Sequence, residues 1–195
     1  IRWISKHPRD TRWFMMINYF DAHLPYWPPR KFRDAFLSPP LSTADLKQVN
    51  QNPWAYYSGR APMDARDFQI LESLYHASIL YLDHWLERLI GFLKETGRID
   101  NTMVIITSDH GENITEKPVF GHNLYLNEQL LRVPMIIHYP QGFPPGHRIS
   151  SRVQSLDLFY TILEAAELSD LQRSTHAARN ISLKEIVEGD DIEMP

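Results

Sequence analysis

The chain contains no cysteine among its 195 residues. This absence excludes a disulfide framework and a zinc–thiolate site, and it leaves the redox compartment and the localisation undetermined. The chain also lacks an apolar run that approaches the ~20 residues of a membrane span, so we expect no span in it. Basic residues are outnumbered, because 20 Lys and Arg stand against 24 Asp and Glu, for a net charge of −4. Nucleic-acid-binding proteins normally carry a basic surplus, so we expect no nucleic-acid partner.

The remaining composition is that of a globular protein. Hydrophobic residues make up 43% and charged residues 23% of the chain, which distinguishes it from disordered sequences. A length of 195 residues fits one domain or a large piece of one, and it is enough to bury a core.

Short apolar runs predict buried strands. They are residues 13–20 (WFMMINYF), residues 101–108 (NTMVIITS) and residues 133–139 (VPMIIHY), with a shorter candidate at 149–153. The middle run is rich in β-branched residues, which favour strands. A run that is apolar at every position is typical of a strand buried on both faces of a sheet.

Helical periodicity appears between these runs. Apolar residues recur at helical spacing from Asp64 to about Gly97, which predicts one long helix or two with a bend. Asp64 and Asp67 suit its N-terminal cap, and Gly97 suits its C-terminal end. Residues 156–167 predict a second amphipathic helix, and residues 30–63 predict irregular structure with short helices. Strands separated by helices indicate an α/β fold with a mixed, mostly parallel sheet and helices on both faces.

Ligands of such sheets bind beyond the carboxyl ends of the strands, and this rule marks two places. Asp109 and His110 directly follow the strand at 101–108. Carboxylate oxygen suits Ca²⁺, Mg²⁺ or Mn²⁺, and imidazole widens the choice toward transition metals. Gly111 allows a tight bend after them, since glycine tolerates positive φ. The alternative is that Asp109 caps a turn and His110 forms a local hydrogen bond.

His23 and His122 are the other two candidates. His23 follows the first apolar run, in a loop stiffened by prolines and aromatics that could hold an imidazole against an anionic oxygen. His122, in the stretch FGHN, could hydrogen-bond a ligand oxygen or protonate a leaving group. Taken alone, each histidine could equally be one that only satisfies a backbone carbonyl.

Taken together, five stretches resemble the sulfatase family of the alkaline phosphatase superfamily. Residues 18–26 (NYFDAHLPY) are similar to the family's F-x-x-H-x-P-Y segment. Residues 102–112 (TMVIITSDHGE) resemble its strand with a metal-binding Ser-Asp-His-Gly-Glu end. Residues 120–122 (FGH) and 130–137 (LLRVPMII) resemble the loop and the L-R-V-P strand that follow. Residues 155–163 (SLDLFYTIL) resemble the next helix, D-L-x-x-T-L.

The resemblance implies a role for each matched residue. Asp109 and His110 would be two ligands of a single divalent cation, usually Ca²⁺ in sulfatases, with Mn²⁺ and Mg²⁺ as alternatives. His23 would contact an oxygen of the substrate's sulfate. His122 would bind the ester oxygen and assist the leaving group. Cationic groups at these places lower the barrier because charge develops on the transferred and leaving oxygens.

One part of the family pattern is missing. The chain has no Cys-x-Pro-x-Arg or Ser-x-Pro-x-Arg motif, whose first residue supplies the nucleophile and becomes formylglycine in sulfatases. We therefore expect residues 1–195 to be the C-terminal portion of one sulfatase-type catalytic domain, with a core at about 10–168 and a tail at 169–195. The N-terminal half of the alkaline phosphatase-like sheet would be absent, and the formylglycine would belong to that missing part.

Three functions remain open at this point. The first is part of a metal-dependent sulfatase that hydrolyses small-molecule sulfate esters. The second is a phosphonate or phosphate-ester hydrolase, or a lipid headgroup phospho-transferase, of the same superfamily. The third is a non-catalytic truncated domain, or one half of a two-chain enzyme with an N-terminal partner segment. Substrate choice would lie in residues 30–63, whose aromatics could stack on a sugar or aryl ring or pack into the core: Trp27 just before them, then Phe32, Phe36, Trp54, Tyr56 and Tyr57.

Overall fold

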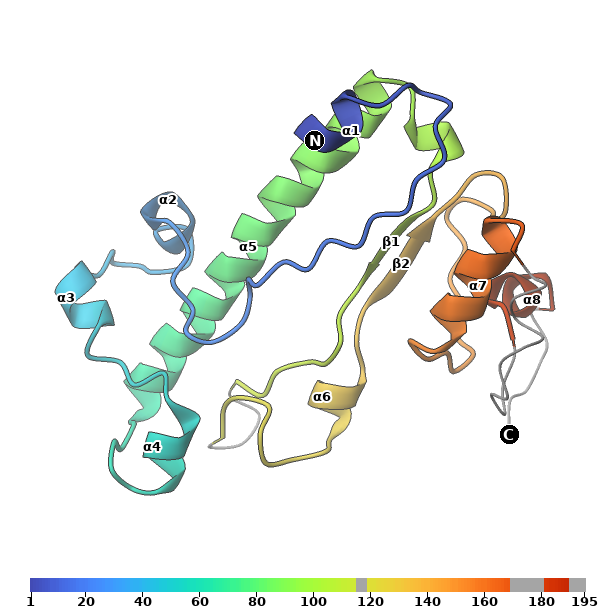
Figure 1. Cartoon of the computed structure of the whole chain (residues 1–195). Coiled ribbons are helices and arrows are strands. Elements are labelled where there is room, and N and C mark those ends of the chain that lie inside the picture. Colours follow the sequence, from blue (N-terminus) through green and yellow to red (C-terminus); the bar gives the residue numbers. More distant parts are fainter. Residues whose placement is uncertain (115–118, 169–180, 190–195) are drawn as a thin grey trace. The chain divides into compact units, whose positions relative to one another are not determined.

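A computed structural model describes residues 1–114, 119–168 and 181–189 of the chain. The chain divides into two compact units (Figure 1). The first unit comprises Ile1–Thr96 and His110–Val133, and the second comprises Gly97–Asp109 and Pro134–Pro195. No helix in the described ranges is long and apolar enough to cross a membrane.

The first unit is built on one long helix. Its elements are α1 (Arg2–Ser5), α2 (Arg30–Arg33), α3 (Thr43–Leu46), α4 (Pro53–Tyr57), α5 (Ala65–Glu95) and α6 (Glu128–Leu131). The sequence prediction of one long helix is confirmed by α5, which has 31 residues. Asp64 and Asp67 form a reciprocal capping box at its start, and Gly97, at φ 61°, follows its end. The capping box satisfies two backbone N–H groups that the first turn of a helix leaves without partners.

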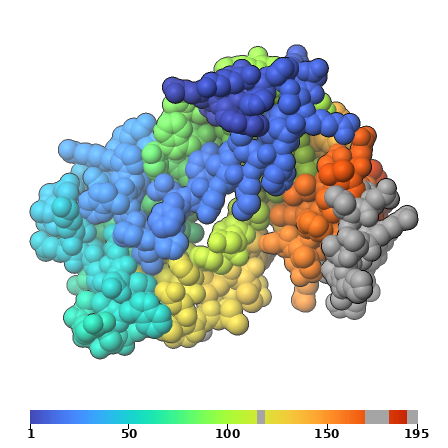
Figure 2. Space-filling view, viewed as in Figure 1, coloured from blue at the N-terminus to red at the C-terminus, as the bar shows by residue number. Residues whose placement is uncertain are grey.

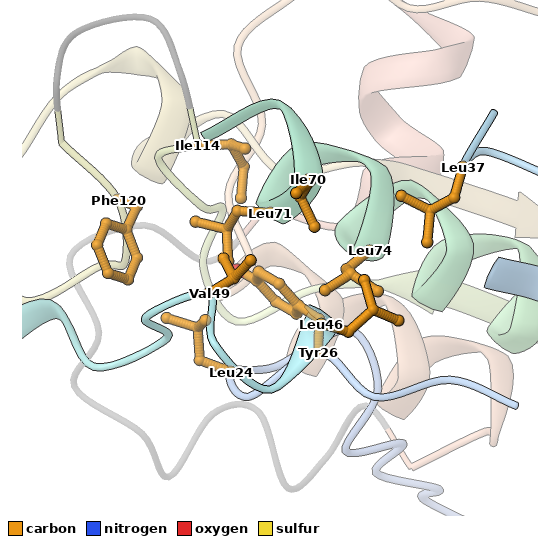
Figure 3. Close-up of a cluster of buried hydrophobic side chains, with 10 residues drawn as sticks. All are labelled: Leu24, Tyr26, Leu37, Leu46, Val49, Ile70, Leu71, Leu74, Ile114 and Phe120. Carbon is orange, nitrogen blue, oxygen red and sulfur yellow. The ribbon is translucent and has the colours of Figure 1, made fainter. Parts of the chain in front are cut away.

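The core of the first unit lies on the N-terminal half of α5. Ten buried apolar side chains form one cluster (Figure 3): Leu24, Tyr26, Leu37, Leu46, Val49, Ile70, Leu71, Leu74, Ile114 and Phe120. Leu71 and Leu74 of α5 are fully buried, and each contributes about 1.5–3 kcal/mol by leaving water. The cluster joins Leu24 and Tyr26, and also Ile114 and Phe120, to α5, although these two pairs are far apart in sequence.

The predicted strand at residues 13–20 does not form. This segment is extended but has no strand partner among the described residues, and Phe14 and Met16 are 72% and 83% exposed. It is the blue stretch after α1 in Figure 1, and Figure 2 shows blue atoms at the molecular surface. The prediction of a strand buried on both faces is therefore wrong for this chain, because an apolar run becomes a strand only when a neighbour supplies hydrogen bonds.

The second unit contains a small antiparallel sheet. Strands β1 (Val104–Thr107) and β2 (Met135–His138) pair with Val104 opposite His138 and Thr107 opposite Met135. Both strands were predicted, but a mostly parallel sheet was expected, and the one ladder in the described residues is antiparallel. The short 3-10 helix η1 (Ile99–Asn101) precedes β1. The other strand candidate, at 149–153, is not a strand.

Two helices complete the described part of the second unit. The predicted amphipathic helix is α7 (Asp157–Ala165), and α8 (Leu183–Glu188) packs against it. The Thr161 hydroxyl donates to the Asp157 carbonyl at 2.7 Å and accepts from the Leu183 backbone N–H at 2.9 Å. The expected tail at 169–195 thus contains a packed helix, while residues 169–180 and 190–195 lie outside the described residues.

Candidate functional site

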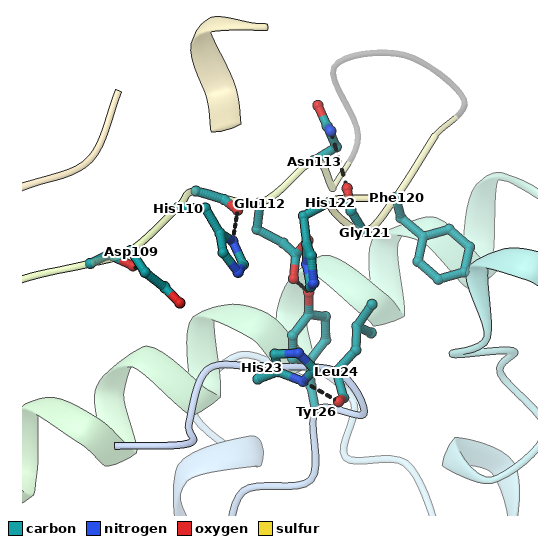
Figure 4. A network of polar contacts seen from close by, with 12 residues as sticks. His23, Leu24, Tyr26, Asp109, His110, Glu112, Asn113, Phe120, Gly121 and His122 are labelled. Atoms are coloured by element: carbon teal, nitrogen blue, oxygen red, sulfur yellow. Dashed lines mark hydrogen bonds and ion pairs between the residues drawn. The ribbon is translucent and has the colours of Figure 1, made fainter. Parts of the chain in front are cut away.

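Three histidines from two distant segments meet in the first unit (Figure 4). The ring centroids of His23 and His122 are 5.2 Å apart, and those of His122 and His110 are 4.2 Å apart. His23 lies in the loop before the buried 24–26 segment, whereas His110 and His122 flank the loop that enters the core at Ile114 and Phe120. The structure thus brings together three of the four residues that the sequence singled out.

Each of these imidazoles is held through the same ring nitrogen. Nδ1 of His23 contacts the Leu24 carbonyl, and Nδ1 of His110 lies 2.8 Å from the Gly111 carbonyl. Nδ1 of His122 lies 3.1 Å from Oε1 of Glu112. Carbonyl and carboxylate oxygens only accept hydrogen bonds, so Nδ1 carries the proton in all three rings. In His23 and His122, Nε2 is therefore the nitrogen that remains for a substrate oxygen or a proton transfer.

Glu112 links the histidine cluster to the core. Its side chain is only 6% exposed, and its second oxygen, Oε2, accepts a hydrogen bond of 2.8 Å from the Tyr26 hydroxyl. Tyr26 is 1% exposed and belongs to the core cluster. Burial and the neighbouring Glu112 carboxylate raise the pKa of Tyr26 above its usual value, because both disfavour a second negative charge at this place. Neither Glu112 nor Tyr26 was among the candidate site residues predicted from the sequence.

A sharp turn places His122 next to this carboxylate. Gly121 has φ of 85°, and a Cβ on it would lie 2.8 Å from Cγ of Pro53. The backbone N–H of Gly121 donates to the Asn113 carbonyl at 2.9 Å, and the Asn113 amide donates back to the Gly121 carbonyl at 3.1 Å. Tyr57 holds Phe120, the residue before Gly121, because its hydroxyl donates a hydrogen bond to the Phe120 carbonyl at 2.7 Å. The positive φ of this residue and the close approach of Pro53 therefore both require glycine at position 121.

Gly111 is required for a different reason than the sequence suggested. It was expected to provide a positive φ, but its φ is outside that region. A Cβ on Gly111 would clash with the Gln129 backbone carbonyl, and the Gly111 N–H donates to the Leu130 carbonyl at 2.8 Å. Close approach of two backbone segments is the second circumstance that selects glycine. It fixes the chain that follows His110 against the start of α6.

A cleft of about 840 Å³ opens beside His23 and His122, which both line it. The rest of its lining includes six polar side chains: Lys47, Gln48, Asn50, Gln51, Asn52 and Asn123. Within the described ranges no Asp or Glu lines the cleft, so Lys47 is its one formally charged group. Gln51 is fixed in the lining of the cleft, because its side-chain amide accepts a hydrogen bond from the Tyr26 N–H and donates one to the Tyr26 carbonyl. The volume is in the upper part of the range of ligand clefts, roughly 300–1,000 Å³.

The aromatic side chains proposed for substrate stacking lie elsewhere. None of the six is among the described residues that line the cleft. Phe32 is buried against Tyr81 of α5, and Tyr56 packs on Phe120. Packing, the alternative interpretation, therefore holds for Phe32 and Tyr56, whereas Trp27, Phe36 and Trp54 are exposed outside the cleft lining.

The structure does not complete a metal site. The described residues contain no group of three His, Cys, Asp or Glu side chains that could hold a metal ion. Asp109 and His110 are of the right chemical type, a carboxylate and an imidazole. Asp109, however, is the last residue of its segment in the second unit, whereas His110 begins the next segment of the first unit. The two residues fit a divalent cation as a partial set of ligands.

Comparison with known proteins identifies the family. Residues 1–168 match the family described as Sulfatase. The chain is 26% identical over 180 residues to a sulfatase of Formosa agariphila and 29% identical over 192 residues to a choline-sulfatase of Rhizobium meliloti. These matches cover 83% and 91% of this chain but 34% and 36% of the relatives. The chain belongs to the sulfatase family, and sulfatases belong to the alkaline phosphatase superfamily.

A solved structure supports the same fold. A phosphonate monoester hydrolase from Silicibacter pomeroyi superposes with a TM-score of 0.60 at 25% identity, over 86% of this chain and 31% of the hydrolase. The α/β elements described above are thus part of a sulfatase-like fold. The chain spans about a third of the length of the curated relatives and of this solved structure.

Proposed function

We propose that residues 1–195 contribute part of the active site of a sulfuric ester hydrolase. The observation that carries the proposal is the joint position of His23 and His122. They lie 5.2 Å apart by ring centroids, line the same cleft and each engage Nδ1 elsewhere, so both Nε2 atoms remain for the substrate. Membership of the sulfatase family supports the assignment of these residues to ester chemistry.

The chemistry follows from where charge develops. When the S–O bond of a sulfate ester breaks, negative charge grows on the ester oxygen, which needs a proton or a cation. A protonated His122 would donate its Nε2 proton to that oxygen, and the alcohol would leave as the sulfur forms a bond to an incoming oxygen nucleophile. A protonated His23 would donate a hydrogen bond from Nε2 to a non-bridging oxygen of the transferred group. We propose that Asp109 and His110 provide two ligands of a divalent cation, which would supply Lewis-acid stabilisation of those oxygens when bound.

The polar cleft would hold the alcohol part of the substrate. Its lining has Lys47 and several amides but, among the described residues, no Asp or Glu and no Phe, Tyr or Trp. Such a wall favours a polar or hydroxylated alcohol over an apolar aryl group, because its amides and ammonium group can form hydrogen bonds with hydroxyl groups. The choline-sulfatase among the relatives indicates that small polar alcohols are substrates elsewhere in the family.

Binding and turnover test this proposal separately. Titration of the ¹⁵N-labelled chain with inorganic sulfate should shift the ring signals of His23 and His122, and His122→Gln should weaken sulfate binding. His138→Gln, an exposed histidine of β2 in the other unit, is the matched control and should bind sulfate as the native chain does. If the native chain, His122→Gln and His138→Gln bound sulfate with equal affinity, the assignment would be refuted.

Turnover distinguishes this proposal from a second candidate. A phosphonate or phosphate-ester hydrolase is supported by the solved structure with a TM-score of 0.60. The intact protein should hydrolyse an aryl sulfate faster than an aryl phosphate or phosphonate if it is a sulfatase, and the reverse order would favour the second candidate. For residues 1–195 alone we expect negligible turnover, because they contain neither Cys-x-Pro-x-Arg nor Ser-x-Pro-x-Arg.

A further inference from the structure

We propose that Glu112, anchored by Tyr26, is a positioning residue that fixes both the orientation and the tautomer of His122. The proposal rests on the proposed function for its catalytic meaning, but its structural content stands on the contacts alone. Glu112 has one oxygen on each neighbour: Oε1 is 3.1 Å from Nδ1 of His122, and Oε2 accepts from the Tyr26 hydroxyl at 2.8 Å. Its two oxygens therefore connect the ring that faces the cleft with a side chain of the core.

The anchor at the core end is rigid. The Tyr26 side chain is almost fully buried, and its ring lies 5.3 Å from that of Tyr75 on α5. Its backbone N–H and carbonyl are both bonded by the side-chain amide of Gln51, at 2.6 and 3.3 Å. A hydroxyl held in this way does not follow the motion of its partner. The Glu112 carboxylate, which is 6% exposed, consequently has little freedom to release His122 toward solvent.

His122 needs this remote support more than the other two histidines do. His23 and His110 engage carbonyls of the residue immediately after each, so their tautomer is set locally. His122 instead engages a side chain ten residues earlier, which is itself tied to a residue 86 positions away. Residues 123–126, which follow His122, are exposed. Removal of Glu112 would take away the hydrogen-bond partner of Nδ1 in His122, and with it the contact that selects the position of the proton.

The tautomer of His122 decides whether its Nε2 atom accepts or donates a hydrogen bond in the cleft. With its Nδ1 proton donated to Glu112, His122 offers Nε2 as an acceptor when neutral and as a donor when protonated. With the opposite tautomer, neutral His122 would carry its proton on Nε2 and lose the contact with Glu112. Partners that orient a functional imidazole in this way typically change affinity or activity about 10- to 100-fold when removed. Glu112 would therefore act on the substrate only through His122.

Long-range ¹H–¹⁵N NMR of the full 195-residue chain tests the proposal. Spectra are recorded at about pH 9, well above the usual histidine pKa of about 6.5, so that the rings are neutral. We expect His122 to show the Nδ1–H pattern in the native chain and to shift to a mixture or to Nε2–H in Glu112→Ala. His23 should keep the Nδ1–H pattern in both and serves as the internal control. An Nε2–H pattern for native His122, or an unchanged pattern in Glu112→Ala, would overturn the proposal.

Two further variants protect the test against simple misfolding. Glu112→Gln keeps an acceptor oxygen and should retain most of the Nδ1–H pattern, whereas Tyr26→Phe should loosen it to an intermediate degree. If Glu112→Ala does not fold by circular dichroism, these two variants decide, and a full native pattern in Tyr26→Phe would refute the role of the anchor. Sulfate affinity separates the two proposals: we expect a fall of about 10-fold in Glu112→Ala. If Glu112→Ala lost the Nδ1–H pattern of His122 but bound sulfate with unchanged affinity, the positioning role of Glu112 would stand. The role of His122 in sulfate binding would then be refuted.

Discussion

Replacement of Gly121 by alanine separates a backbone cost from a packing cost, because the chain offers two matched glycines. Gly121 has φ of 85°, and its added Cβ would lie 2.8 Å from Cγ of Pro53, a buried ring at the start of α4. Gly59 has φ of 71° but would meet nothing within 4 Å. Gly91 lies inside α5, and its Cβ would also meet nothing within 4 Å.

The three substitutions should give three different stabilities. Gly59→Ala should cost about 1–2 kcal/mol, the price of a left-handed conformation for a residue with Cβ. Gly121→Ala should cost the same plus about 1–3 kcal/mol for overpacking against a rigid ring, or about 2–5 kcal/mol together. Gly91→Ala should stabilise by about 0.5–1 kcal/mol, because alanine is the better helix former.

Urea unfolding followed by circular dichroism and fluorescence measures these differences. The decisive quantity is the free energy of unfolding of Gly121→Ala minus that of Gly59→Ala, which contains only the steric contact with Pro53. A difference near zero would refute the close packing of the 120–122 turn on α4. If Gly91→Ala destabilised the chain, the description of that position in α5 as open would be wrong.

The other predictions concern the site. Tyr26→Phe should destabilise the chain by about 1.5–3 kcal/mol, since it removes a hydrogen bond to a charged group. Because the folded state raises the pKa of Tyr26 above the unfolded value of about 10, this contribution is complete below about pH 10 and declines as the pH rises further. Unfolding measured from pH 9 to about pH 11 should show that decline in the native chain and less of it in Tyr26→Phe. For Asp109 and His110, calorimetry should detect at most weak Ca²⁺ binding, because two ligands hold Ca²⁺ poorly in water. A submicromolar dissociation constant that survived Asp109→Asn would contradict this expectation.

Local patterns predicted the local elements well. The helix α5 follows from apolar spacing and from Asp64 and Asp67, which lie within one turn of each other and need no distant partner. Strands β1 and β2 follow from β-branched runs. Their antiparallel pairing could not be predicted in this way. The direction of pairing depends on the path of the 27 residues between the two strands, which is longer than any local pattern. The strand prediction for residues 13–20 was wrong for the same reason, since the composition of this segment favours a strand but does not supply a neighbouring strand.

The site shows the same division between local and long-range information. His23, His110 and His122 were singled out as candidates because each lies in a short stretch with a recognisable pattern, and the structure brings the three rings together. Glu112 and Tyr26 were missed because their meaning depends on a contact between residues 86 positions apart. A signal existed nonetheless, because each lies two or three residues beyond a candidate histidine in the same quoted stretch.

Alternation along the 23–26 segment explains how a core can position a surface histidine. His23 and Pro25 are exposed and line the cleft, whereas Leu24 and Tyr26 are buried in the cluster on α5. Because Leu24 and Tyr26 are held in the core, they fix the direction of the exposed residues that alternate with them along this bend. Phe120 anchors His122 in the same manner from the other segment, with Gly121 between them. The spacing of the two rings is therefore set by hydrophobic packing on α5, and any change that loosens this packing should alter binding before it unfolds the chain.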